Sequence, residues 1–143
     1  MFDLARDVDT HVRTSASSCE RAVAPGKTTG ALELGDVVTF EGKHLGIRQR
    51  LTARVVEMDR PVRFVDEQVR GAFRRLRHVH EFIECGCETL MRDTIEWISP
   101  LGPLGWLADY LAVARHLRAF ISTKQQALKR LAEEARIDEI RMP

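Results

Sequence analysis

The chain has 143 residues and a formal net charge of +1, with charges of both signs interspersed along it. This length suits a single domain over 1–143 with a proper hydrophobic core, and the charge balance argues against a nucleic-acid partner. Asp3 and Asp7 lie near the first residue, where a secretory leader would need an uninterrupted apolar run. No stretch approaches the length of a membrane span, which is about 20 apolar residues, so we expect a cytoplasmic protein without a transmembrane segment.

The N-terminal part of the chain predicts little regular structure. Met1–Val8 has the pattern of a short helix, Cys19–Ala24 is a candidate strand, and Pro25–Gly35 is a glycine-rich loop.

Four hairpin-linked strands are predicted within Asp36–Ile98, because apolar and polar residues alternate there with period two. One face of each strand is charged and the other is mostly apolar, as in an antiparallel sheet that is covered on one side. A further segment, Val62–Val69, is ambiguous, because its valines oppose Phe64 and Asp66.

Turn signals set the predicted registers. The expected turns are Leu45-Gly46, Met58–Pro61, Gly71 and Cys85-Gly86. The first turn pairs His44 with Ile47 and Phe40 with Leu51. The rows predicted across the sheet are Val55, Phe64, His78 and Asp93, followed by Val38, Ala53, Asp66, Leu76 and Ile95. The rows agree on which face is inside, and a slip of one residue at Gly71 would turn Asp66 outward.

A long amphipathic helix follows the strands. It is predicted to begin near Pro103 and to reach Glu133, with a frayed tail over 136–143. One apolar stripe at helical spacing comprises Leu104, Leu107, Leu111, Ala114, Ile121 and Leu128, and it is widened by Trp106, Tyr110, Val113, Leu117 and Phe120. Because this helix is so apolar, it must lie across the concave face of the sheet or against another chain.

Several motifs resemble one protein family. They are Gly35–Phe40, Arg63–Glu67, Arg77–Phe82, Met91–Asp93 and Pro100–Gly105. They are similar to the polyketide cyclase/dehydrase-like group of the START/Bet v 1 (SRPBCC, helix-grip) superfamily, and the resemblance covers nearly the whole chain. It implies an α+β fold in which a curved antiparallel sheet wraps a long C-terminal helix. This superfamily includes lipid carriers, aromatase/cyclases, hormone receptors and co-chaperones, so the fold does not fix the function.

The chain departs from the family pattern at its start. The family begins with a strand and then short helices, whereas Met1–Val8 already has the pattern of the first helix. The first family strand is therefore predicted to be missing, or the start to be assigned too far downstream. A missing strand would leave backbone N–H and C=O groups of the neighbouring strands without hydrogen-bond partners. A homodimer that pairs through that sheet edge would satisfy them.

The three cysteines carry little functional information. Cys85 and Cys87 flank one turn, but a lone Cys-x-Cys lacks the second ligand pair of a zinc site. We expect reduced thiols in a cytosolic hairpin.

Polar residues on the predicted concave face say more about function than the cysteines do. His78, His80, Asp66, Gln68 and Asp93 all point inward in the predicted registers. They form either a satisfied structural patch, in which Asp93 orients His78, or a polar anchor for a ligand. His78 and Asp93 are also the candidates for a catalytic acid–base pair. A metal site is not expected, because the His-x-His spacing still requires Asp66 or Asp93 as a third ligand.

Three functions remain open from the sequence. The first is binding of a small hydrophobic molecule, such as a lipid, an isoprenoid or a polyketide-like ring system, without a cofactor. The second is an aromatase/cyclase or dehydratase activity, and the third is a protein-interaction module. For the first, the predicted ligand-binding residues are Phe40, Leu51, Phe64, Asp66, Leu76, His78, His80, Met91, Asp93, Ile95, Trp97, Leu107 and Leu111.

Overall fold

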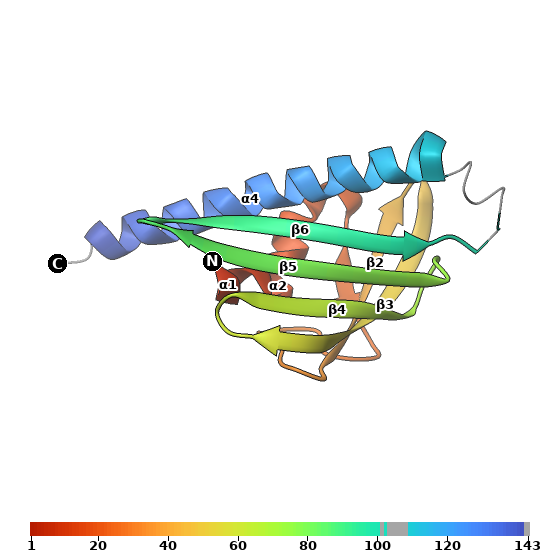
Figure 1. Ribbon diagram of the computed structural model, residues 1–143, viewed down its shortest axis with the longest axis horizontal. Coiled ribbons are helices and arrows are strands. Elements are labelled where there is room, and N and C mark those ends of the chain that lie inside the picture. The colour runs from red at the N-terminus through yellow and green to blue at the C-terminus, as the bar shows by residue number, and fades with distance from the viewer. Residues whose placement is uncertain (101, 103–108, 142–143) are drawn as a thin grey trace.

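The computed structural model of the protein describes residues 1–100, 102 and 109–141. These residues form one six-stranded antiparallel sheet in which each strand pairs with the next along the chain (Figure 1). The long helix α4 runs beside β6 (Figure 1) and contacts the short helices α1 and α2. The strands are β1 (Arg21–Val23), β2 (Val37–His44), β3 (Ile47–Asp59), β4 (Arg63–Arg70), β5 (Arg75–Cys85) and β6 (Glu88–Ile98).

Two short helices, α1 (Phe2–Ala5) and α2 (Val8–Thr14), replace the single helix predicted at the start. They separate because Asp7 is extended and caps α2, accepting a hydrogen bond of 2.8 Å from the Thr10 amide. A 3₁₀ turn, η1 (Ala16–Ser18), then leads to β1, which lies within the predicted strand Cys19–Ala24.

The N-terminal helices close one end of the sheet. The ring of Phe2 lies edge-on to Phe64 and Phe82, at centroid distances of 5.6 and 5.3 Å. These three rings form one buried apolar cluster, and a second cluster packs Val8 of α2 against β2 and β3. The core therefore lies at the α1–α2 end of the concave face.

The first hairpin has the predicted register, with His44 opposite Ile47. The later rows were predicted incorrectly. His78 lies opposite Asp66 instead of Phe64, and Asp93 lies opposite His80 instead of His78. The last hairpin turns one residue later than predicted, because Cys85 still pairs with Glu88. Both pairings move by two residues, so every side chain stays on its predicted face.

The β3–β4 pairing contains a bulge that the sequence pattern does not reveal. Val56 has no partner between the pairs Val55–Asp66 and Glu57–Val65. The predicted contact of Val55 with Phe64 is wrong because the turn lies later in the chain than predicted, so that Asp59 still pairs with Arg63 and Phe64 faces Met58.

Three of the four pairings in the second predicted row are also wrong. Ala53 faces Gln68 and not Asp66, Asp66 faces His78 and not Leu76, and Leu76 faces Trp97 and not Ile95. These are again shifts of two residues along a strand.

The ambiguous segment Val62–Val69 falls largely within β4. Phe64 and Asp66 point to the helix side, as predicted, while Val65 is fully buried on the other face opposite Val79. Val69 lies on the same face as Val65 but is 57 % exposed, so apolar residues occur on both faces of this segment and its period-two pattern is unclear.

The C-terminal helix begins, in its described part, with a π-helical turn, η2 (Asp109–Val113), and continues as α4 (Ala114–Arg141). The predicted start near Pro103 lies outside the described residues. Helix α4 extends to Arg141, and fraying of the tail over 136–143 stays a prediction.

The outer strands of the described sheet are β1 and β6, and no described strand precedes α1. None of the helices in the described ranges has both the length and the hydrophobicity needed to cross a membrane.

Candidate functional site

A cavity of about 340 Å³ lies between the concave face of the sheet and helix α4. Apolar side chains of β2 to β6 form most of its wall on the sheet side. On the helix side it is lined by Val113, His116, Leu117, Phe120, Ile121 and Lys124, which follow one face of the helix at a spacing of three or four residues.

All five histidines of the chain line this cavity. His11 comes from α2, His44 from β2, His78 and His80 from β5, and His116 from α4. Histidines from four elements thus meet in one mainly apolar space, together with buried carboxylates and a lysine. They form two clusters, named below after Asp66 and Glu20.

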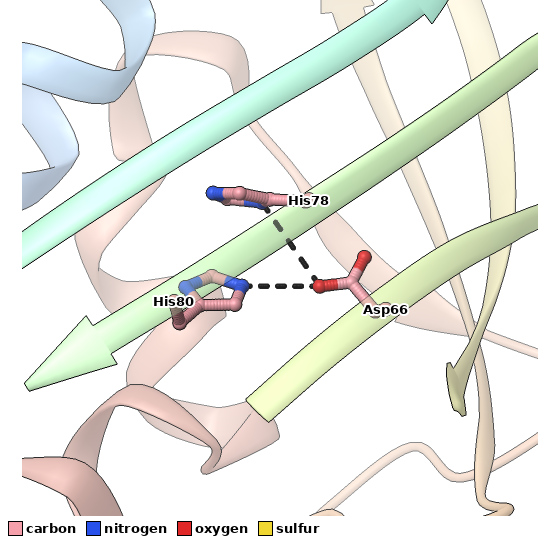
Figure 2. A group of neighbouring side chains, drawn as sticks. All are labelled: Asp66, His78 and His80. Atoms are coloured by element: carbon pink, nitrogen blue, oxygen red, sulfur yellow. Dashed lines mark hydrogen bonds and ion pairs between the residues drawn. The ribbon is translucent and has the colours of Figure 1, made fainter. Parts of the chain in front are cut away.

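The Asp66 cluster consists of Asp66, His78, His80 and Asp93 on neighbouring strands and of Gln125 on α4. His80 Nε2 is 3.0 Å and His78 Nδ1 is 4.0 Å from Asp66 Oδ2 (Figure 2). On their other sides, His78 Nε2 is 2.9 Å and His80 Nδ1 2.8 Å from Asp93 Oδ1. The amide of Gln125 on α4 donates to the second oxygen of Asp93 at 2.5 Å. Each imidazole therefore lies between two carboxylates.

The two histidines of this cluster differ in their affinity for protons. Burial and the neighbouring His80 lower the pKa of His78, despite its hydrogen bond to Asp93. Burial also opposes protonation of His80, but its contacts with Asp66 and Asp93 are stronger and raise its pKa. Burial acts to raise the pKa of Asp93, yet the two histidines keep it well below its usual range. Asp93 is therefore ionised.

This charge state fixes the tautomer of a neutral His78. An ionised carboxylate only accepts hydrogen bonds, so the proton of His78 lies on Nε2, facing Asp93. The lone pair of Nδ1 then points toward Asp66 in the cavity. Such a nitrogen can accept a proton or ligate a metal ion.

The Glu20 cluster connects α2, β2 and α4, and consists of His11, Glu20, His44, His116 and Lys124. Glu20 binds His11 Nε2 and His44 Nε2, each at 2.9 Å. His44 Nδ1 is 3.0 Å from His116 Nε2, and Lys124 Nζ is 2.6 Å from His11 Nδ1. The His11 ring also stacks on Phe40, with the ring centroids 3.7 Å apart.

Burial disfavours the charged forms of His11 and Lys124 in this second cluster. Burial and the adjacent Lys124 lower the pKa of His11 to about 4, although Glu20 acts in the opposite direction. Burial also lowers the pKa of Lys124. Glu20 has its pKa held far below the usual range by His11 and His44, against the effect of burial. The cluster thus places an ionised carboxylate beside a neutral His11 inside the cavity.

Most of the predicted ligand-binding residues line the cavity. The structure places Phe40, Leu51, Phe64, Asp66, Leu76, His78, His80 and Ile95 in its wall. Met91 and Asp93 line a small adjoining pocket of about 20 Å³, which shares His11, His78 and His80 with the cavity.

Two predicted residues have other positions, and a third is not described. Trp97 is not among the lining residues and lies beside Phe73, with ring centroids 6.4 Å apart. Leu111 is 64 % exposed, so its prediction as a wall residue is wrong. Val113 faces the cavity instead, and a residue two positions away on a helix points to nearly the opposite side. Leu107 lies outside the described residues.

The sequence prediction missed the Glu20 cluster. One signal was available: Lys124 lies between Phe120, Ile121 and Leu128 on the apolar stripe of the helix, where a charge is unusual. No local signal connects it with His11, which is 113 residues earlier.

No protein-family model matches the chain, and no curated protein matches it. Among solved structures, TTHA0849 from Thermus thermophilus matches with a TM-score of 0.74 and 17 % identity, over 94 % of this chain and 88 % of that one. Major latex-like protein 151 from Panax ginseng matches with a TM-score of 0.50 and 15 % identity, over 76 % of this chain and 78 % of that one. These likenesses show the fold: the chain has the α+β helix-grip architecture of Bet v 1-like proteins.

Proposed function

We propose that this protein binds a small, mainly apolar molecule in the cavity between the sheet and α4. The observation that carries the proposal is a cavity of about 340 Å³ with apolar walls and two polar clusters. Sites for small organic molecules have volumes of about 300–1,000 Å³ and combine apolar walls with a few placed polar groups. A lipid, an isoprenoid or a polyketide-like ring system with one polar end has this chemistry.

The polar clusters support a ligand with a polar end. Burying charged groups costs free energy that pairing among themselves only roughly offsets, so such groups are weak devices for stability alone. Both clusters reach the cavity wall, through Asp66 and His78 in one and Glu20 and His116 in the other. A ligand hydroxyl or carbonyl can hydrogen-bond there while its apolar body contacts Phe40 and the surrounding wall.

Native mass spectrometry of the purified protein, followed by denaturing extraction of any bound molecule, tests the proposal without knowledge of which apolar ligand is bound. A co-purifying apolar molecule supports it and identifies the class. If the protein is purified without a ligand, we test whether the cavity binds an apolar fluorescent probe such as 1-anilinonaphthalene-8-sulfonate. Failure to bind any apolar probe would remove the proposal.

Filling the cavity provides the matched mutational test. Ile95 lines the cavity, whereas Ile98 on the same strand is 52 % exposed and is not a lining residue. We expect Ile95→Trp to weaken probe binding at least about tenfold, because the indole takes up ligand volume, while Ile98→Trp leaves it unchanged. Fluorescence titration measures both. Equal affinities of the two variants would place the probe outside the cavity.

A second candidate function is acid–base catalysis by His78 and Asp93, as in a cyclase or dehydratase. The observation that favours it is a 2.9 Å hydrogen bond between His78 Nε2 and Asp93, with His78 Nδ1 left free to accept a proton from a bound carbon acid.

Isotope exchange tests this candidate. A bicyclic ketone with acidic α-hydrogens, such as 2-tetralone, is incubated with the protein in heavy water, and deuterium uptake is followed by mass spectrometry. We expect His78→Ala to slow any protein-catalysed exchange by about 10²-fold or more while ketone affinity changes little. Exchange that is equally fast with His78→Ala would exclude His78 as the base.

We further propose that two copies associate through the sheet edge left by the missing first family strand, and that the protein is cytoplasmic. A long edge strand exposes unpaired backbone groups. Three exposed free cysteines, Cys19, Cys85 and Cys87, suit a reducing compartment. The native mass spectrum reports the oligomeric state directly, and a monomer at micromolar concentration would count against the dimer.

A further inference from the structure

Asp66, His78 and His80 direct one ligand atom each toward a common point, and we propose that they bind a divalent transition-metal ion. The three atoms lie within 4.8 Å of one another. Figure 2 shows the two imidazoles of β5 facing the carboxylate of β4. His80 Nε2 is already 3.0 Å from Asp66 Oδ2, and His78 Nδ1 is 4.0 Å from it.

These spacings suit a metal ion with small adjustments. With metal–ligand distances of about 2.1 Å, neighbouring ligand atoms of an octahedral ion are about 3 Å apart. The His80–Asp66 pair has this separation, and His78 Nδ1 needs to approach by about 1 Å. Because all three residues lie on paired strands, the ligand set is built on rigid elements.

Asp93 supplies the outer shell of such a site. Its Oδ1 contacts the ring nitrogen of each histidine that faces away from Asp66, at 2.9 Å for His78 and 2.8 Å for His80. Gln125 in turn holds the other oxygen of Asp93. A carboxylate behind the imidazole is the usual way in which proteins orient a metal-ligating histidine.

The donor set selects the class of metal. Two imidazoles and one carboxylate, without a thiolate, suit Zn²⁺, Fe²⁺ or Co²⁺. Three protein ligands leave coordination positions open toward the cavity, where water or an oxygen of a bound molecule can enter. The metal site does not require the apolar ligand, so failure of one proposal is distinguishable from failure of the other.

The test uses untagged full-length protein, stripped with a chelator and titrated with Co²⁺ while visible absorption is recorded. We expect one ion per chain with a dissociation constant below about 10 μM. Asp66→Asn and His80→Gln should weaken binding at least about 100-fold, and Asp93→Asn about 10–100-fold through loss of orientation. The matched control is His116→Gln, another cavity histidine outside the ligand set, which should bind as the wild type does.

Two results would overturn the site. One is the lack of stoichiometric Co²⁺ binding, and the other is binding that survives Asp66→Asn or is abolished by His116→Gln. Circular dichroism checks that each variant is folded. If the variants unfold, NMR of the wild-type histidine rings with Zn²⁺ decides, because the site requires shifts at His78 and His80 and not at His116.

Discussion

We expect Asp93→Ala to lower the free energy of unfolding by about 3–5 kcal/mol at pH 7. Removing one member of a buried charge network leaves the remaining polar groups buried without a partner. The Asp93 side chain is 3 % exposed and contacts His78, His80 and Gln125. Without it, His80 loses one of the two carboxylates beside its ring, and the Gln125 amide loses its acceptor. Urea unfolding followed by circular dichroism measures the loss.

Two variants make this prediction specific. Asp93→Asn keeps the shape and one acceptor oxygen, so we expect a smaller loss of about 1–2 kcal/mol. Glu96→Ala removes an exposed carboxylate from the opposite face of the same strand and should change stability by less than about 0.5 kcal/mol. A loss below about 1 kcal/mol for Asp93→Ala would mean that the Asp66 cluster contributes little to the fold, and that its polar residues are retained for another reason.

The sequence predicts the Asp66 cluster because strand alternation survives errors in register. Asp66, His78 and Asp93 were expected on the concave face, and they lie there although two of the predicted pairings were displaced by two residues. A displacement by an even number preserves the face and changes only the neighbours. The exact contacts, such as His80 with Asp93, depend on turn geometry and therefore required the structure.

Other features depend on contacts that no local pattern encodes. The bulge at Val56 has no marker in the sequence, and the face of the helix that meets the cavity includes Val113, so Leu111 points outward. The Glu20 cluster joins His11 to Lys124 across nearly the whole chain. Periodicity places residues on faces, but it does not show which distant faces meet.

The Glu20 cluster leads to an expected pH dependence of stability. Burial and Lys124 lower the pKa of His11 to about 4 in the folded protein, against about 6.5 for an unperturbed histidine. Between these values the unfolded chain binds a proton that the folded protein does not, so His11 makes the free energy of unfolding fall as the pH falls. From pH 7 to 4.5 this contribution amounts to about 2 kcal/mol.

Other histidines titrate in the same range, so the prediction concerns a difference between two proteins. His78 acts in the same direction as His11, while the raised pKa of His80 makes its contribution to stability grow as the pH falls. We therefore expect wild type to lose about 2 kcal/mol more than His11→Gln between pH 7 and 4.5, in urea unfolding at matched ionic strength. Parallel pH profiles would show that His11 is readily protonated in the folded state. In that case Glu20, and not burial or Lys124, would determine its charge in the cavity.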